Sequence, residues 1–210
     1  MTVLGSRRWY SFCVEPVVVR TRGSARREEL LSGLVEIFLA EGFRAFSVED
    51  LAVRLQCSKS TLYAIAPSKE QLITAVVRAF FRRATDRVEA RLREEVEPAR
   101  RIGAYLHAIA AELSPASGVF YADLHAFAPA RELYSRNTAI AARRIQELVR
   151  AAERPGRPVD AVFLGAVAAQ VMESIQQGQL RALTSLDDAA AYNALADLIV
   201  AGVAGAPRDP

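Results

Sequence analysis

Residues 58–63 concentrate side chains that can hydrogen-bond to a nucleic acid. Ser58, Lys59, Ser60, Thr61 and Tyr63 follow one another with one apolar residue before the last. Lysine binds phosphate, serine and threonine hydroxyls bind either the backbone or base edges, and tyrosine can bind both. This composition suits the groove of a duplex, provided that one helix face presents these side chains together.

The stretch before this cluster predicts a short supporting helix. Apolar residues recur at positions 48, 51, 52 and 55, which is the i, i+3, i+4, i+7 spacing of a buried helical stripe. Ser47 precedes the stripe as a cap, and Asp50 stands three positions later, where its carboxylate can complete a capping box. We therefore expect this helix to pack inward and to support the element that follows.

A second short helix is predicted directly after a tight turn. Ser58 can cap it, and Leu62 would point back toward the first helix, which leaves Lys59, Ser60 and Thr61 mostly outward. Two short helices joined in this way form a helix-turn-helix. The alternative is a helical hairpin that packs against the core and contacts no nucleic acid.

A long helix is predicted to start at Lys69. Pro67 breaks the chain, and Ser68 with Gln71 forms another capping pair. A lysine in the first turn opposes the helix dipole by roughly 0.3–1 kcal/mol, so we expect an external anion to compensate it. A phosphate bound at the free N–H groups of that turn would do so.

Residues 26–80 resemble the DNA-binding domain of the TetR family of bacterial transcriptional regulators. The motifs that carry the resemblance are Ala40-Glu41-Gly42-Phe43, Ser47–Ala52, Ser58–Tyr63 and Pro67–Leu72, and the segment 26–80 that contains them is about a quarter of the chain. The chain departs from the family at Gln56, where glycine is common, and at residues 64–66, which are usually more aromatic. The DNA-contacting residues that we infer are Ser47, Ser58, Lys59, Ser60, Thr61, Tyr63, Ala64 and Lys69. For Ala64, the contact reduces to a methyl group against a thymine.

Composition and length are compatible with this interpretation. The 210 residues carry a net charge of +3 with a pI near 9.1, which permits nucleic-acid binding without requiring it. Cys13 and Cys57 lack the spacing of a metal site, so a reduced, cytoplasmic chain without a metal or cofactor is the simplest interpretation. The longest apolar run, residues 161–169, is far shorter than the roughly 18 residues of a membrane span.

The chain divides into four predicted parts. We expect a flexible basic tail over 1–24, the helix-turn-helix domain over 25–72, a helical ligand-binding and dimerisation domain over 73–205, and a disordered C-terminus over 206–210. The first predicted helix has an apolar stripe over 30–38, and arginines at positions 20, 22, 26 and 27 precede it, so they could form an arm that reaches phosphate or the minor groove. A solvated charged tail is the alternative.

The second half is predicted to be entirely helical. The long helix should continue to about Val96, until Pro98 stops it, and spans roughly 40 Å at ~1.5 Å per residue. Further helical patterns run over 100–113, 121–127, 131–152, 159–178 and 186–203, with breakers at 114–118, 129 and 154–158. No segment alternates with the period of a strand, so the fold class is all-α.

The last two long helical patterns predict a dimer interface. The helix after position 159 is almost entirely apolar over its first half, and the last helix is similar, so both need covering on most sides. Pairing with a second copy would form a four-helix interface, which is also what the resemblance implies. Burial inside one protomer is the alternative. The candidate interface residues are Val162, Gly165, Ala169, Leu195, Leu198 and Gly202.

Aromatic and polar residues in the second half predict a small-molecule pocket between the long helix and the helices over 121–127 and 159–178. Apolar walls with a few polar groups are the usual composition of such a site. The candidate residues are Tyr105, Phe120, Tyr121, His125, Tyr134, Met172 and Gln176. Aromatic side chains at helical spacing also form ordinary core, which is the alternative at each position.

No catalytic signature is present in the sequence. His107, His125 and Asp123 could form an acid–base set, but their spacing indicates nothing specific. We therefore expect a sequence-specific regulator of transcription, not an enzyme, that forms a homodimer and is released from a palindromic operator in double-stranded DNA by a small, largely apolar effector. The alternative is an all-α carrier or enzyme with an incidental helix-turn-helix, which would have no need of exposed Lys59, Tyr63 and Lys69.

Overall fold

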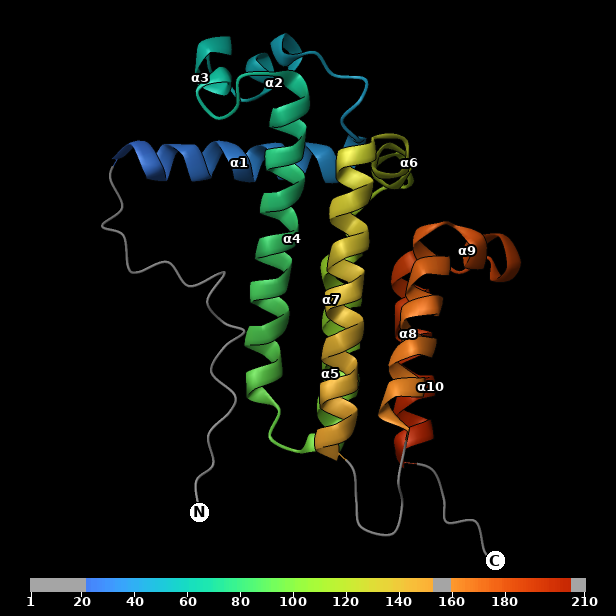
Figure 1. Ribbon diagram of the computed structural model, residues 1–210. Helices are drawn as coiled ribbons and strands as arrows, with labels where there is room; N and C mark the ends of the chain where they lie inside the picture. Colours follow the sequence, from blue (N-terminus) through green and yellow to red (C-terminus); the bar gives the residue numbers. More distant parts are fainter. Residues whose placement is uncertain (1–21, 153–159, 205–210) are drawn as a thin grey trace, which may run out of the picture.

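The computed structural model describes residues 22–152 and 160–204, and this part of the chain is helical without a strand (Figure 1). The helices are α1 (Arg22–Glu41), α2 (Val48–Arg54), α3 (Lys59–Tyr63), α4 (Lys69–Glu94), α5 (Pro98–Leu113), α6 (Gly118–Ala126), α7 (Ala128–Ala152), α8 (Ala161–Gln176), α9 (Gln179–Thr184) and α10 (Asp188–Ala204). The all-α prediction is confirmed. Expectations for residues 1–21, 154–158 and 206–210 lie outside the described residues.

The predicted helix caps are present. Ser47 Oγ accepts a hydrogen bond from Asp50 N at 3.1 Å, and the Asp50 carboxylate accepts one from Ser47 N at 2.8 Å, which completes the capping box. The Ser47 hydroxyl, which donates to the carboxylate at 2.7 Å, and Ser47 N together hold the pKa of the Asp50 carboxyl below its usual value. Ser58 and Ser68 cap α3 and α4 through the N–H three residues later, each at 3.2 Å. Local sequence therefore fixes three successive helix starts.

Several helices of the second half begin earlier than predicted. Pro98 does not only end the preceding helix; it occupies the first position of α5, where its missing N–H has no consequence. The chain segment before α6, predicted as a breaker, contains Ser117, which caps α6. The proline at position 129 lies in the first turn of α7. Short α9 was not predicted, because it buries no residue and lies between the left-handed residues Gly178 and Ser185.

The expected basic arm is also corrected. Arg22, Arg26 and Arg27 belong to the first turns of α1 and do not precede it. Arg26 forms an ion pair with Glu29 one turn later, at 2.7 Å. Arg20 lies outside the described residues. Arg26 and Arg27 are exposed and therefore present charge from a helix surface.

The first three helices pack against the N-terminal part of α4. Leu34, Phe38, Leu51 and Leu62 are almost completely buried there. α1 runs nearly crosswise to α4, and α2 and α3 lie at one end of the molecule (Figure 1). α4 leaves this unit and extends into the second half, as predicted.

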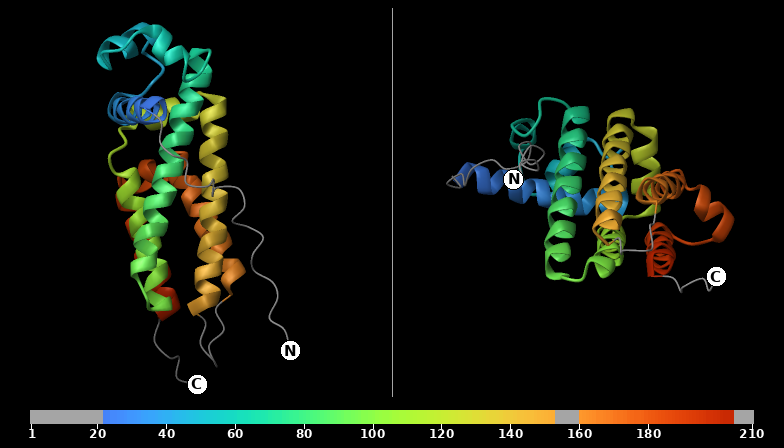
Figure 2. Two further views of the ribbon diagram at one scale, coloured as in Figure 1. Left: turned by 90° about the vertical axis from the view of Figure 1, so that its left-hand side faces the viewer. Right: turned by 60° about the horizontal axis from the view of Figure 1, so that its bottom comes forward.

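The second half is a bundle of long helices. α4, α5 and α7 lie roughly parallel, and α8 and α10 cover α7 and α5 on the far side from α4 (Figures 1 and 2). α6 lies at the end of this bundle nearest α1 and contacts both α1 and α7. In the described part of the chain, no helix combines the length and apolar character needed to cross a membrane.

Aromatic rings connect the two halves. Phe43, in the loop after α1, contacts Phe120 of α6 edge-on at 6.2 Å between ring centroids. Phe120 contacts Phe80 of α4 at 5.8 Å, and the neighbouring Phe81 stacks on Tyr134 of α7 at 5.4 Å. The core is thus continuous from the first unit into the bundle.

Candidate nucleic-acid interface and ligand cavity

The helix α3 presents the predicted polar face to solvent. Lys59, Ser60, Tyr63 and Ala64 are exposed, whereas Leu62 is completely buried against the core. Tyr63 has 46% of its surface exposed although it is a large aromatic residue. The single buried residue of this short helix therefore orients the polar residues outward, as the sequence predicted.

The hydroxyl groups at the start of α3 form a small network. Ser58 Oγ lies 2.7 Å from Ser60 Oγ and 2.8 Å from Thr61 Oγ1. Because Ser58 also caps the helix, its hydroxyl is largely committed to the fold. Ser60 and Thr61 retain hydrogen-bonding capacity on the outer side, so they are the stronger candidates for contact with a duplex.

Both lysines of the chain lie in this unit, and both have protein partners. Lys59 forms an ion pair with Glu49 of α2. Lys69 Nζ donates a hydrogen bond to the Arg44 carbonyl oxygen at 2.9 Å. The Arg44 carbonyl thus partly compensates the unfavourable interaction of Lys69 with the helix dipole. The ammonium group keeps two further donors, which can bind an external anion.

Gln56 in the turn between α2 and α3 adopts a left-handed conformation, with φ of +49°. Only glycine adopts this region without a steric cost. The turn therefore requires the conformation that glycine favours, and glutamine adopts it here at a steric cost.

The α2 helix is also fixed to the end of α1. Arg54 forms an ion pair with Glu41, and its guanidinium lies 4.6 Å from the ring centroid of Phe46. The hydrogen bond from Arg54 holds the pKa of the Glu41 carboxyl below its usual value. The helix-turn-helix is therefore attached to α1 by contacts on its own surface as well as by the core.

The loop after α1 is held by α6 from the second half. The buried Asp123 carboxylate accepts hydrogen bonds from Phe43 N at 2.6 Å and Arg44 N at 2.8 Å. Ser117 N donates to the Leu39 carbonyl oxygen at 2.8 Å. α6 thus binds the C-terminal end of α1 through three backbone groups. Sequence analysis considered Asp123 only as part of an acid–base set, and its actual partners are not readable from spacing.

A cavity of about 130 Å³ lies in the bundle between α4, α5 and α7. An engineered apolar cavity of roughly 150 Å³ holds benzene, which gives the scale of a ligand that this space can take. The lining residues are Phe81, Ala84, Thr85, Val88, Glu89, Tyr105, Ile109, Glu112, Leu113, Tyr134, Asn137, Thr138, Ile140, Ala141, Arg144, Met172 and Tyr192. The walls are mostly apolar and aromatic.

Three of the seven predicted pocket residues line this cavity: Tyr105, Tyr134 and Met172. The other four do not. Phe120 and Tyr121 are buried at the α6 end of the bundle and pack among other aromatic rings. His125 is only partly buried near the end of α6, and Gln176 is buried near the end of α8 outside the lining. Contrary to expectation, α6 contributes no wall of the cavity.

The sequence places the long helix beside the pocket without singling out its lining residues, and it does not predict the α10 wall. Phe81, Ala84 and Val88 of α4 recur at helical spacing on one face, so this wall could have been found from the pattern of a long helix that continues beyond the first unit. Tyr192 comes from an alanine-rich helix and is almost completely buried. Only its size among small neighbours distinguishes it in the sequence.

Charged residues of the cavity wall are paired. Arg144 of α7 hydrogen-bonds both carboxylate oxygens of Glu89 on α4, at 3.0 and 3.1 Å. The buried Glu112 of α5 pairs with Arg87, and Arg91 lies 3.9 Å from it. These pairs link neighbouring helices and neutralise the wall. Among the described residues, no group of acidic, histidine and cysteine side chains could hold a metal ion.

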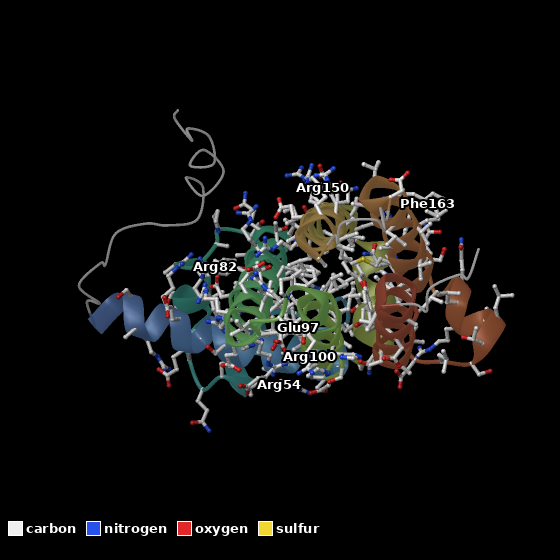
Figure 3. All side chains as sticks on the ribbon, turned by 90° about the horizontal axis from the view of Figure 1, so that it is seen from below. Arg54, Arg82, Glu97, Arg100, Arg150 and Phe163 are labelled. Atoms are coloured by element: carbon white, nitrogen blue, oxygen red, sulfur yellow. The ribbon has the colours of Figure 1, made fainter. Side chains whose placement is uncertain are left out.

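The predicted dimer residues divide into two sets. Val162 and Leu198 have 58% and 66% of their surface exposed, and Gly202 is also exposed. Ala169 is half-buried. Phe163, beside Val162, also points away from the bundle (Figure 3).

Two of these residues are corrected, because they face the interior of the protomer. A Cβ atom on Gly165 would lie 2.0 Å from Gln146 Cγ of α7, so Gly165 permits close packing of α8 on α7. Leu195 is buried in the core. Neither can contribute to an exposed interface of this chain.

Residues 30–76 match the family model of bacterial regulatory proteins, tetR family. A search of curated protein sequences gives no match. The matched segment contains most of α1, the helix-turn-helix and the start of α4. The sequence resemblance to this family is therefore confirmed. Members of the family are transcription factors and not enzymes.

Solved structures with similar folds agree. A candidate transcriptional regulator from Saccharomonospora viridis, in complex with choline, matches with a TM-score of 0.67 at 19% identity, over 84% of this chain and 96% of that chain. A TetR/AcrR family regulator from Thermobifida fusca matches with a TM-score of 0.60 at 20% identity, over 88% and 100%. A TetR family regulator from Thermus thermophilus gives 0.56 at 21% identity, over 85% and 99%. The chain has a TetR-like fold, with an N-terminal DNA-binding domain and a helical C-terminal domain.

Proposed function

We propose that this chain, a DNA-binding regulator with the TetR-like fold, is a homodimeric repressor that a small molecule releases from a palindromic operator. The observation that carries the proposal is the orientation of α3. Leu62 is buried, while Lys59, Ser60 and Tyr63 remain exposed on a helix of the correct type for a major groove. Such a protein would act in the cytoplasm, where the bacterial chromosome lies.

The division of labour on this face follows from side-chain chemistry. Lys69 and the capped helix starts at Ser47 and Ser58 would bind phosphate and set the register of the protein on the duplex. Ser60, Thr61 and Tyr63 would reach base edges and provide sequence preference, with Ala64 limited to an apolar contact. Lys59 would leave its ion pair with Glu49 and contact the duplex instead.

A second copy would place two α3 helices on one duplex. The exposed residues Val162, Phe163, Leu198 and Gly202 give α8 and α10 an apolar outer surface, which a mate can cover. A two-fold dimer reads a palindrome whose half-sites are separated by about one turn of duplex, ~34–36 Å.

The effector would act through α4 and α6. The cavity borders α4, whose first turn lies beside the helix-turn-helix, and α6 holds the loop after α1 through Asp123. A ligand that favours a DNA-incompetent spacing of the two α3 helices by ~1–3 kcal/mol would weaken operator binding roughly 5- to 150-fold. The choline complex of the Saccharomonospora viridis protein supports a small-molecule site in this fold.

Selection of bound duplexes from a random pool tests the proposal. We expect a palindromic consensus, bound by two protomers, and loss of binding when Tyr63 and Thr61 are both replaced by alanine. The control variant Val53→Ala changes an exposed residue at the end of α2 that makes no proposed contact. Recovery of no consensus, or of an asymmetric site bound by one protomer, would contradict the proposed mode of binding.

A further inference from the structure

The wall of the cavity contains buried hydrogen-bonding groups without a partner. Among the described residues, Tyr134 Oη and Gln176 Nε2 are two of only three buried side-chain atoms that lack a hydrogen bond. Tyr134 has 4% of its surface exposed and lines the cavity, while Gln176 lies behind that wall with 7% exposed. A buried polar group without a partner is costly and uncommon, so this pair requires an explanation.

Tyr192 completes this polar region. Its side chain is 1% exposed, lines the same cavity and lies near both Tyr134 and Gln176. Tyr134 and Gln176 approach the Tyr192 hydroxyl as weak hydrogen-bond donors, but neither contact reaches normal hydrogen-bond geometry. Two hydroxyls and an amide thus gather at one side of the cavity, and all three can donate.

The charges around the cavity are already neutralised. Glu89 is paired with Arg144, and Glu112 with Arg87. An anionic ligand would therefore lose hydration without gaining an unpaired cation, and Asp188 near Tyr134 adds a further unfavourable charge. An ammonium ligand would likewise find Glu89 and Glu112 already paired with arginines, so it too would lose hydration without gaining an unpaired carboxylate on the wall. Both charged classes are disfavoured.

We infer that the cavity binds a small neutral molecule with an apolar body of about the size of a benzene ring and one oxygen that accepts a hydrogen bond from Tyr134. This inference rests on the proposed effector function and names the ligand class for that site. The apolar body would occupy the space beside Phe81, whose ring stacks on Tyr134. Alcohols, phenols and small carbonyl compounds belong to this class.

The protonation state of Tyr134 agrees with a donor role. Burial raises the pKa of its hydroxyl well above the ordinary tyrosine value. The group therefore keeps its proton over the physiological range. Ile140 of α7 also lines the cavity and has 52% of its surface exposed, so a ligand can enter beside this residue.

Calorimetry with four probes of similar size tests the inference on the full-length protein. The probes are benzyl alcohol, ethylbenzene, benzylammonium and benzoate. We expect benzyl alcohol and ethylbenzene to bind, and the two ions to bind at least about tenfold more weakly than benzyl alcohol. Tyr134→Phe should weaken benzyl alcohol about 3- to 10-fold, the range of one neutral hydrogen bond, and leave ethylbenzene within about twofold.

The matched control is Tyr121→Phe, which removes the same atom from a buried ring of α6 that does not line the cavity. Its effect on benzyl alcohol should be less than twofold. Thermal melts of the ligand-free proteins distinguish a binding role of Tyr134 from a structural one, because loss of a structural hydroxyl would lower the melting temperature. Tyr134→Phe should leave the melting temperature unchanged or raise it, because it removes an unsatisfied buried hydroxyl.

Three results would overturn the inference: no binding of benzyl alcohol to the wild type up to its solubility, equal losses in Tyr134→Phe and Tyr121→Phe, or a melting temperature lowered by several degrees in Tyr134→Phe. Operator titrations, made separately, distinguish the proposed function. If benzyl alcohol binds through Tyr134 but operator affinity stays unchanged at saturation, the assignment of the cavity stands and the proposed effector control fails.

Discussion

The carboxylate of Asp123 on α6 accepts a hydrogen bond from the backbone N–H of Phe43 at 2.6 Å. This bond joins a helix of the C-terminal half to the loop that leads from α1 into the helix-turn-helix. The preceding residue, Gly42, has φ of +76°, and a Cβ atom there would lie 2.6 Å from the same carboxylate oxygen. The close approach of α6 to this loop thus requires both an acidic residue and a glycine.

Asp123→Asn is expected to weaken this attachment. An amide has one acceptor oxygen and no charge, so its hydrogen bonds to Phe43 and Arg44 are weaker, and we expect a loss of about 1.5–3 kcal/mol in the free energy of unfolding. Chemical denaturation measures the loss. Asp86→Asn, on the exposed face of α4, is the control and should change stability by less than about 0.5 kcal/mol. Equal stability of the two variants would mean that the Asp123 bonds contribute nothing to the fold.

Gln56→Gly is expected to stabilise the protein. The left-handed conformation of Gln56 costs roughly 1–2 kcal/mol for a residue with a side chain, and glycine loses about 0.4–1 kcal/mol of this gain to its larger freedom in the unfolded chain. A net gain of about 0.5–1 kcal/mol follows. Val53→Gly is the control, because position 53 lies within α2. This variant should lower the free energy of unfolding by about 0.5–1 kcal/mol. A lower melting temperature for Gln56→Gly would contradict the account of this turn.

The two lysines are expected to respond differently to substitution. Lys69→Ala should weaken binding to every duplex alike and reduce the salt slope by about one, because a phosphate contact carries no sequence information. Lys59→Ala should alter sequence preference as well as affinity. Fluorescence anisotropy titrations over a range of salt concentrations, with specific and scrambled duplexes, measure both. Lys69→Ala binding that matches the wild type at every salt concentration would refute the phosphate assignment.

A labelling experiment can test the same assignment without a substitution. Lys59 and Lys69 are the only lysines of the chain, so an amine reagent has just these two side chains to modify. A specific duplex should slow modification of both relative to the free protein. Rates unchanged at both lysines would place the duplex elsewhere.

Sequence predicted the helix-turn-helix well because its determinants are local. Ser47, Ser58 and Ser68 lie within three residues of the groups that they cap, and Leu62 faces inward as its spacing requires. The cavity was predicted only in part, because its walls come from five helices whose mutual rotation depends on tertiary packing. Tyr134 lies on the cavity wall and Phe120 does not, although both are aromatic residues on apolar helix faces.

The same reasoning explains the corrected dimer residues. Gly165 suggested close approach of a helix, which is what the structure has, but the neighbour is α7 of the same chain. A pattern of small and apolar residues specifies that a helix is covered without specifying which helix covers it. The exposed members of the predicted set are therefore the ones to test.

Leu198→Glu and Phe163→Glu are expected to convert a dimer into monomers without unfolding the chain. Both side chains are exposed in the protomer, with 66% and 63% of their surface accessible, so a carboxylate there costs little in a monomer but is buried without a partner in the proposed interface. Sedimentation at micromolar concentration measures the association, and thermal melts check the fold.

Gly165→Leu is the contrasting variant, since its side chain would clash with Gln146 inside the protomer and lower the stability of the monomer itself. Because two α3 helices must bind together, the glutamate variants should also lose most operator affinity while retaining weak binding to a single half-site. Wild-type sedimentation as a monomer, with and without DNA, would refute the dimer, and dimeric glutamate variants would place the interface on another face.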